Sequence, residues 1–136
     1  MAEAYNTEGL KRIWSTQTRQ SATHANTSIN CANATIDELF SALKDEVYTG
    51  RMIDCIVVSV PSFNGSSHQF VVEDSQREPA KFAVYNAPQL LIAQLVPGRA
   101  FRLLHPYVRL ANDGSIMLRV DDPLSTIKVQ TLYTIC

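Results

Sequence analysis

Aromatic and basic side chains interleave in the second half of this sequence, a combination with the chemistry to bind single-stranded nucleic acid. Aromatic rings stack on bases, and cationic side chains contact the phosphate backbone. Phe63 is the best single candidate, because a phenylalanine in the Gly/Ser/Asn-rich segment Pro61–Ser67 has little core to join. The remaining candidates are Lys81, Tyr85, Arg102, His105, Tyr107, Arg109 and Arg119.

Strand alternation indicates which of these side chains can act together. Successive residues of a strand point to opposite faces. Lys81 and Tyr85 therefore share one face of an expected strand, and Tyr107 and Arg109 share one face of another. We expect both pairs to point outward, because apolar residues occupy the alternate positions.

Ordinary structural roles compete with this interpretation. Phe63 could fold over the end of the core, and we weigh the two roles equally. For Tyr85 and Tyr107, a ring packed in the sheet with its hydroxyl in water is the more common role. The arginines could be solvated charges, with carboxylate partners at Asp54, Glu73 or Asp121. One aromatic pair with a few arginines would bind weakly, at ~1–3 kcal/mol per stacked base.

The overall charge does not favour strong attraction to a polyanion. Twelve Lys and Arg residues against 13 Asp and Glu residues leave a formal net charge of −1 over 136 residues. Nucleic-acid-binding domains usually carry a basic excess, because phosphate contacts dominate their affinity. The hydrophobic fraction of 46% and the charged fraction of 18% are typical of a soluble globular domain.

Catalytic and metal-binding patterns are missing from the sequence. The histidines and cysteines are too scattered for ligand spacing; they are His24, His68, His105, Cys31, Cys55 and Cys136. Adjacent carboxylates, as in Asp121-Asp122, point to opposite faces of a strand and make no acid–base couple. The sequence therefore predicts a protein that is not an enzyme and that needs no cofactor or metal.

Apolar alternation predicts the elements that position the candidate residues. The expected strands are Arg51–Val60, His68–Asp74, Lys81–Asn86, Arg99–Leu110 and Ser115–Asp121, with a helix at Ala87–Leu95. Pro106 predicts a bulge or break in the fourth strand. A capping-box pattern at Thr35–Glu38 predicts a helix that caps the barrel before the first strand. This order is that of a mainly β, five-stranded Greek-key barrel of OB-like type.

The chain divides into two expected parts. Residues 1–33 are polar and without sustained apolar period, which predicts a flexible N-terminal arm, and residues 34–136 form the expected OB-fold domain. Trp14 either folds back onto the barrel or anchors a protein partner. Nothing in the sequence is typical of an export signal or a membrane span, so we expect a nuclear or cytoplasmic protein. An organellar address stays open, because Leu10–Gln20 is basic and contains Ser and Thr.

Two longer stretches of the sequence resemble members of a known superfamily. The stretch HQFVVEDSQREPAKFAVYNAP, followed by LVPGRAFRLLHPYVRLANDGSIMLRVDDP, resembles OB folds such as the single-stranded-DNA-binding domains of replication protein A and its telomeric relatives. The shared features are the VED strand end, an aromatic in the next strand, PG before the fourth strand and the NDG hairpin. The stretch also resembles the OB-like N-terminal segment of tetratricopeptide-SET proteins, which is not itself catalytic. The resemblance spans roughly Gly50–Val129 and implies a binding module.

Two functions are consistent with these observations. The first is a non-catalytic module that binds single-stranded DNA or RNA within a larger complex, which the frequency of this activity among OB folds favours. The second is a protein-interaction module that binds no nucleic acid, which the near-neutral charge favours. Such a module would dock through edge strands, the capping helix or Trp14. The first is our working hypothesis, with a protein partner expected in either case and no membrane.

Overall fold

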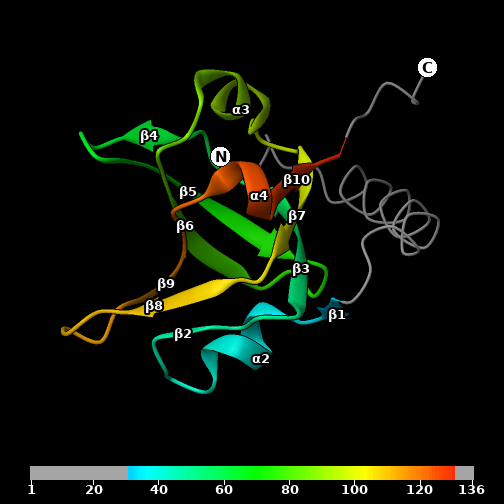
Figure 1. The fold of residues 1–136 in the computed structure, drawn as a ribbon, viewed down its shortest axis with the longest axis vertical. Helices are drawn as coiled ribbons and strands as arrows, with labels where there is room; N and C mark the ends of the chain where they lie inside the picture. Colours follow the sequence, from blue (N-terminus) through cyan, green and yellow to red (C-terminus); the bar gives the residue numbers. More distant parts are fainter. Residues whose placement is uncertain (1–30, 131–136) are drawn as a thin grey trace.

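The computed structural model describes residues 31–130, and the expected roles of Trp14 and of most of the arm lie outside these residues. The described part is mainly β, with short helices at its two ends (Figure 1). Its strands are β1 (Ala32–Asn33), β2 (Glu46–Val47), β3 (Arg51–Val57), β4 (Ser62–Phe63), β5 (Ser67–Asp74), β6 (Pro79–Tyr85), β7 (Ala100–Leu104), β8 (Tyr107–Leu110), β9 (Ile116–Val120) and β10 (Ile127–Val129). Its helices are α2 (Ile36–Phe40), α3 (Gln89–Gln94) and α4 (Pro123–Thr126).

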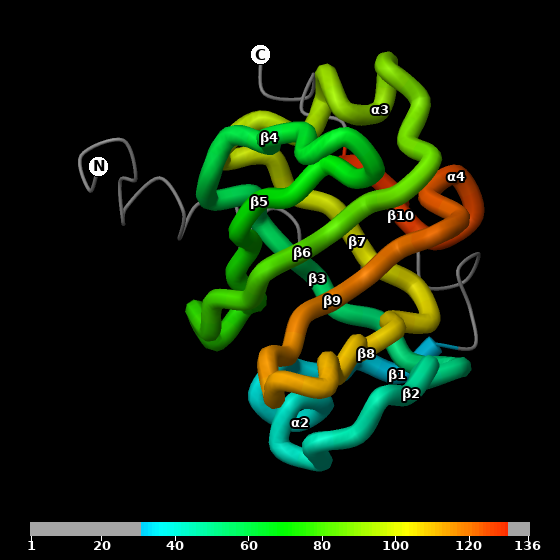
Figure 2. Tube along the Cα trace, turned by 90° about the vertical axis from the view of Figure 1, so that its left-hand side faces the viewer, coloured from blue at the N-terminus to red at the C-terminus, as the bar shows by residue number. Residues whose placement is uncertain are grey.

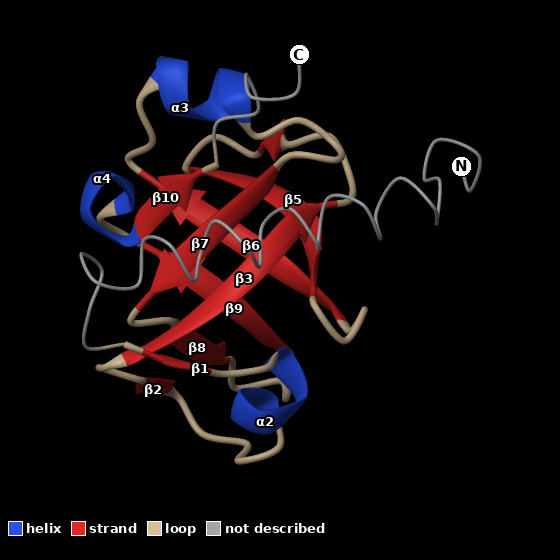
Figure 3. Ribbon diagram, turned by 90° about the vertical axis from the view of Figure 1, so that its right-hand side faces the viewer, coloured by secondary structure: helices blue, strands red, loops and turns tan. Residues whose placement is uncertain are grey.

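The strands form one strongly curved sheet. Its order is β10-β7-β3-β5-β6-β9-β8-β2, with β1 paired to β3 and β4 paired to β5. The β6–β9 pair is parallel, whereas β5–β6 and β8–β9 are antiparallel. Figures 2 and 3 show from opposite sides how the strands wrap around a common interior. This is an OB-like arrangement, with β3, β5 and β6 before α3 and with β7, β8 and β9 after it.

Two features of the sheet differ from the sequence-based prediction. The sheet has ten strands instead of five, because the predicted fourth strand is divided, β10 and β2 extend the two ends, and β1 and β4 pair with β3 and β5. Its hydrogen-bonded order is not closed into a ring. The predicted fourth strand is also two strands, β7 and β8, separated by His105 and Pro106. Proline has no N–H for the ladder, which explains the break that Pro106 predicts. The chain turns sharply here, with His105 at a φ of 49°.

Three phenylalanine rings lie at the centre of the core. Phe70 and Phe82 meet edge to face with their centroids 5.1 Å apart, and Phe82 stacks on Phe101 at 5.5 Å. All three side chains are buried. Phe70 and Phe82 are directly opposite one another across β5 and β6, so the core face of this pair is fixed by its register. Side chains at the alternate positions of β6 must therefore point outward.

The capping helix α2 lies against one end of the barrel (Figure 1). Thr35 accepts a hydrogen bond from the Glu38 N–H at 3.1 Å, and Glu38 accepts one from the Thr35 N–H at 3.4 Å. Both bonds of the capping box are therefore present, as the sequence pattern predicts. Ile36 and Leu39 face the core and are buried.

Buried Asp74 joins this helix to the β5–β6 hairpin. Its Oδ2 accepts a hydrogen bond from the Ile36 N–H at 2.7 Å. Its Oδ1 accepts bonds from the N–H groups of Gln76 and Glu78 at 2.9 and 3.0 Å. One carboxylate thereby satisfies backbone donors from two segments that are far apart in the sequence.

We predict that Asp74→Asn lowers the free energy of unfolding by about 2–3 kcal/mol, because the amide NH₂ must face one of these buried N–H donors. Urea denaturation followed by circular dichroism measures this change. Asp37→Asn is the matched control, since Asp37 is exposed on α2, and its effect should stay within about 0.5 kcal/mol. Equal stability of wild type and Asp74→Asn would contradict this role.

Candidate nucleic-acid interface

Five of the candidate residues lie together on the outer side of three adjacent strands, β6, β9 and β8. We call this surface the outer face, defined by Lys81, Tyr85, Tyr107, Arg109 and Arg119; Figure 2 shows the strands that carry it, β6, β9 and β8, side by side. Register brings them together: Arg119 is opposite Ala83 of β6 on one side and opposite Tyr107 of β8 on the other. The side-chain alternation expected for β6 and β8 is therefore confirmed, since the intervening Phe82, Val84 and Val108 are buried.

A stacked pair occupies the middle of the outer face. The guanidinium carbon of Arg119 lies 4.2 Å from the centroid of the Tyr85 ring. Arg119 also donates hydrogen bonds from Nε and Nη2 to Asp121 Oδ1, at 3.1 and 3.0 Å. These bonds to Asp121 raise the pKa of Arg119. The guanidinium is therefore held over an aromatic ring by a carboxylate, in a cation–π contact on a half-buried side chain.

Asp45 attaches the segment before β2 to the outer face. Its carboxylate accepts a hydrogen bond from the Leu110 N–H at 3.0 Å and one from the Tyr107 hydroxyl at 2.8 Å. The bond from Leu110, then the bond from Tyr107, lowers the pKa of Asp45, with a further contribution from Arg109. The same contact with Asp45 raises the pKa of Tyr107. The Tyr107 ring therefore lies in the sheet surface with its hydroxyl held by a carboxylate.

Each cation of the outer face has a carboxylate close to it. Arg119 pairs with Asp121, Arg109 lies near Asp45, and Lys81 lies near enough to Asp113 to lower the pKa of that carboxyl, after the larger effect of hydrogen bonds from Ser115. These groups are solvent-exposed or half-buried, so each pairing contributes little to stability. The carboxylates instead offset the positive charge of the three cations, so the outer face attracts a polyanion only weakly.

Phe63 lies outside the outer face, on the β4–β5 hairpin. It is opposite His68, which is opposite the inward-facing Val84, so Phe63 is on the other side of the sheet from Tyr85. Its side chain is 62% exposed, and its ring centroid is 4.8 Å from that of His68 at an angle of 41°. Asn64 Oδ1 accepts hydrogen bonds from the N–H groups of Ser66 and Ser67, which holds the turn. Sequence reasoning missed His68 as a partner of Phe63. The Asn-Gly turn signal could have found it, because a hairpin turn sets Phe63 opposite His68.

Two further candidates lie elsewhere. Arg102 is buried on β7, where its Nε and Nη2 donate to the two carboxylate oxygens of Asp54 at 2.8 and 3.3 Å. The structure therefore corrects its placement with the basic groups of the outer face and confirms the pairing with Asp54. His105 is exposed beyond the end of β7, and its Nδ1 accepts a hydrogen bond from the Gly50 N–H at 2.9 Å.

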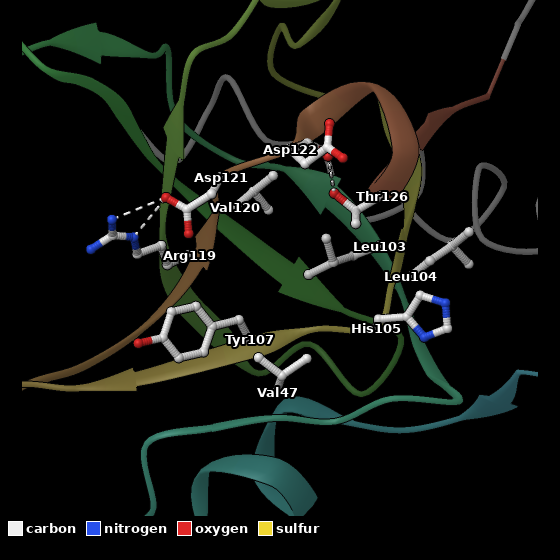
Figure 4. Close-up of a pocket in the computed structure, with 10 residues that line it drawn as sticks. All are labelled: Val47, Leu103, Leu104, His105, Tyr107, Arg119, Val120, Asp121, Asp122 and Thr126. Atoms are coloured by element: carbon white, nitrogen blue, oxygen red, sulfur yellow. Dashed lines mark hydrogen bonds and ion pairs between the residues drawn. The ribbon is translucent and has the colours of Figure 1, made fainter.

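A small cleft of about 120 Å³ lies beside the outer face (Figure 4). It opens where β9 separates from β7, between α4 on one side and the start of β8 on the other. Its lining residues are Val47, Leu103, Leu104, His105, Tyr107, Arg119, Val120, Asp121, Asp122 and Thr126. Tyr107 and Arg119 belong to both the cleft and the outer face.

Residues 31–130 contain neither a candidate metal centre nor a helix that could span a membrane. No three His, Cys, Asp or Glu side chains in this range are grouped so that they could hold a metal ion. Within the same range, no helix has the length and apolar character needed to cross a membrane.

Comparison with solved structures identifies the fold. An OB domain from Methanosarcina mazei matches with a TM-score of 0.54 and 15% identity, over 77% of this chain and 87% of that domain. The HINb domain of p204 matches with a TM-score of 0.51 and 20% identity, over 73% of this chain. This chain spans 47%, about half, of that HINb chain.

The chain has an OB fold. A replication protein A heterotrimer bound to single-stranded DNA also matches, but its TM-score of 0.45 is too low to support an argument. No protein-family model and no curated protein match the sequence. In the order of the OB fold, β5 and β6 are the second and third strands, and the β4 hairpin and the β8–β9 turn are the two loops that flank them.

The lowered pKa of Asp45 predicts that the stability of the folded chain depends on pH. Because its pKa is lowered by folding, its carboxylate stabilises the folded chain at neutral pH, and this contribution is lost as the pH falls through the lowered pKa. Asp45→Asn should remove this component from the pH profile of unfolding. It should also lower the pKa of Tyr107 toward its ordinary value, which an NMR titration of the Tyr107 ring measures. Asp113→Asn is the control, and a Tyr107 pKa unaffected by Asp45→Asn would contradict the contact.

Proposed function

We propose that this OB fold is a non-catalytic module that binds single-stranded nucleic acid across its outer face. We further propose that it works within a larger intracellular complex. The observation that carries the proposal is the stack of Arg119 on Tyr85, at 4.2 Å, on strands between the two loops that OB folds use for oligonucleotides. Phe63, on the β4–β5 hairpin, supplies a second exposed ring, on the side of the sheet that Phe70 and Val84 face.

Stacking supplies most of the binding energy in this proposal. One base stacks on the free side of the Arg119 guanidinium, which Asp121 and Tyr85 hold in a fixed plane. Another base stacks on the exposed ring of Phe63. Each stacked base contributes ~1–3 kcal/mol and depends little on base identity. A duplex hides the faces of its bases, so a single strand is the expected ligand.

Electrostatic attraction between the outer face and the phosphate backbone is expected to be weak. Lys81, Arg109 and Arg119 can contact at most three phosphates, and nearby carboxylates already neutralise part of their charge. For single strands the logarithmic salt slope is about −0.7 per phosphate contacted, so a slope no steeper than about −2 is expected. The module would therefore bind with modest affinity and need a neighbouring subunit for tight binding.

A second candidate function, docking of a protein partner, is favoured by exposed apolar side chains near the end of the barrel opposite α2. The β4 hairpin, α3 and α4 gather at this end in Figure 1. Exposed large apolar residues on these elements and the loops beside them are Val60, Phe63, Leu90, Val96 and Leu124. Exposed apolar side chains that form one contiguous patch are typical of a surface that binds another protein. Phe63 is also a candidate stacking position for a base, although it is not part of the outer face.

We predict that Phe63→Ala and Tyr85→Ala each weaken binding of labelled oligo-dT or oligo-U by about tenfold, because the first removes one stacking position and the second removes the ring that supports Arg119 at the other. Fluorescence anisotropy at two salt concentrations measures this, and a fourfold rise in salt should weaken wild-type binding by no more than about 20-fold. Leu90→Ala is the control: it truncates an exposed apolar side chain of α3 and should leave oligonucleotide binding unchanged.

Either of two results would overturn the proposal. One is failure of the wild-type protein to bind either oligonucleotide at low salt, where attraction is strongest. The other is binding that neither aromatic substitution weakens. The protein-docking function would then remain, with Leu90→Ala as its first test.

A further inference from the structure

The cleft beside the outer face is a gap in the barrel wall. β10 pairs with β7 along Phe101–Leu103 and therefore covers only part of that edge. β8 pairs with β9 as far as Arg119, so the end of β9 also lacks a neighbour on this side among the described strands. Between these two edges, the core residues Leu103 and Val120 form the floor of the cleft (Figure 4).

The lining combines an apolar floor, an aromatic wall and an acidic rim. Tyr107 and Val47 lie on one side of the floor, and the carboxylates of Asp121 and Asp122 lie on the other (Figure 4). Asp121 uses Oδ1 to accept both hydrogen bonds from Arg119. Its other oxygen points to the side on which Tyr107 lies (Figure 4). With two carboxylates and one arginine, the lining carries a net negative charge when His105 is neutral.

This combination fits the side chain of a lysine or an arginine. Such a side chain has an apolar stem, which would cover Val120 and Leu103, and a cationic head, which would reach the acidic rim. A tyrosine ring adds a favourable surface for the cation. A phosphate would meet the two carboxylates, so the cleft is unsuited to the backbone of a nucleic acid.

We propose that the cleft holds a basic side chain from residues 1–30 of the same chain. Lys11, Arg12 and Arg19 are the basic residues of that segment. The segment is attached beside the cleft: the Ala32 N–H donates to the Gly50 carbonyl at 2.7 Å, and the Gly50 N–H donates to His105, a residue of the lining. The 12 peptide units between Arg19 and Cys31 can span up to roughly 40 Å. A tethered ligand this close has a millimolar effective concentration, so a weak contact suffices.

Occupancy of the cleft also regulates the outer face, a consequence that rests on the proposed function. Tyr107 and Arg119 line the cleft and belong to the outer face. A basic side chain near Asp121 competes with Arg119 for that carboxylate, which frees Arg119 from the position that Asp121 fixes over Tyr85. The N-terminal segment and a single-stranded ligand would therefore bind competitively.

The test uses the full chain and NMR spectra of its backbone amides. The triple variant Lys11→Gln/Arg12→Gln/Arg19→Gln should shift the amides of Asp121, Asp122 and Thr126 relative to wild type, and about 1 M salt should abolish the difference by screening. Arginine amide, added as a probe, should shift the same amides in the triple variant more than in wild type, whereas citrulline amide, which has no charge, should shift neither. Arg77→Gln, on the β5–β6 turn, is the control for loss of a basic residue.

A second variant keeps the test independent of the N-terminal substitutions. In the triple-variant background, Asp121→Asn should weaken binding of arginine amide by about tenfold, because it removes the charged acceptor and leaves Arg119 unpaired. Glu78→Gln, an exposed change of equal charge, should have no effect.

Three results would overturn the proposal, and the first two do not depend on oligonucleotide binding. Amides unchanged in the triple variant would exclude residues 1–30 as the occupant, even if added arginine amide binds, in which case the occupant belongs to another protein. Equal shifts with arginine and citrulline amides would exclude recognition of the cation. Shifts of these amides by oligo-dT with no response to arginine amide would assign the cleft to nucleic acid. Failure of the proposed function alone would appear instead as an arginine response without any oligonucleotide binding.

Discussion

The geometry of the outer face depends on buried Asp74. This carboxylate binds the first N–H of α2 and two N–H groups of the turn between β5 and β6, so it fixes helix and hairpin together. The hairpin register runs without interruption from Glu73–Pro79 beside that turn to Ser67–Tyr85 at the far end. Because side-chain direction alternates along a strand, fixing the start of β6 also decides that Tyr85 points outward. A residue outside the site thus sets the orientation of its central ring.

Charge pairing explains why the outer face can be both rich in arginine and nearly neutral. A guanidinium over an aromatic ring needs a second contact to stay in one plane, and a carboxylate supplies it at Arg119. The carboxylate also cancels most of the positive potential, which weakens long-range attraction to a polyanion. The consequence is a surface suited to contacts with flat, uncharged groups more than to phosphates. The near-neutral composition of the chain already indicates weak binding of phosphates, but only the contacts of Arg119 explain it.

Local patterns in the sequence predicted the elements well, whereas contacts between distant segments were hidden. The capping box, the break at Pro106 and the outward direction of Tyr85 each depend on a few neighbouring residues, and the structure has all three. The pairing of Asp54 with Arg102 depends instead on the β3–β7 register, across 48 residues, so the sequence offered it only as one option among several. Asp45 was overlooked because nothing near it in the sequence indicates β8. The extra two-residue strands are too short to have a period of their own.

Arg119 connects the two candidate sites because of the unusual direction of its strand. β9 runs parallel to β6 on one side and antiparallel to β8 on the other, and its last residues extend beyond β8. Arg119 is thus the last residue that still has neighbours on both sides, whereas Asp121, two residues later and on the same face, already borders the gap. The ion pair between them therefore joins the stacked ring to the cleft. In the proposal, a cation that binds Asp121 competes with Arg119 for its charge, so binding at the cleft and binding at the outer face would be coupled.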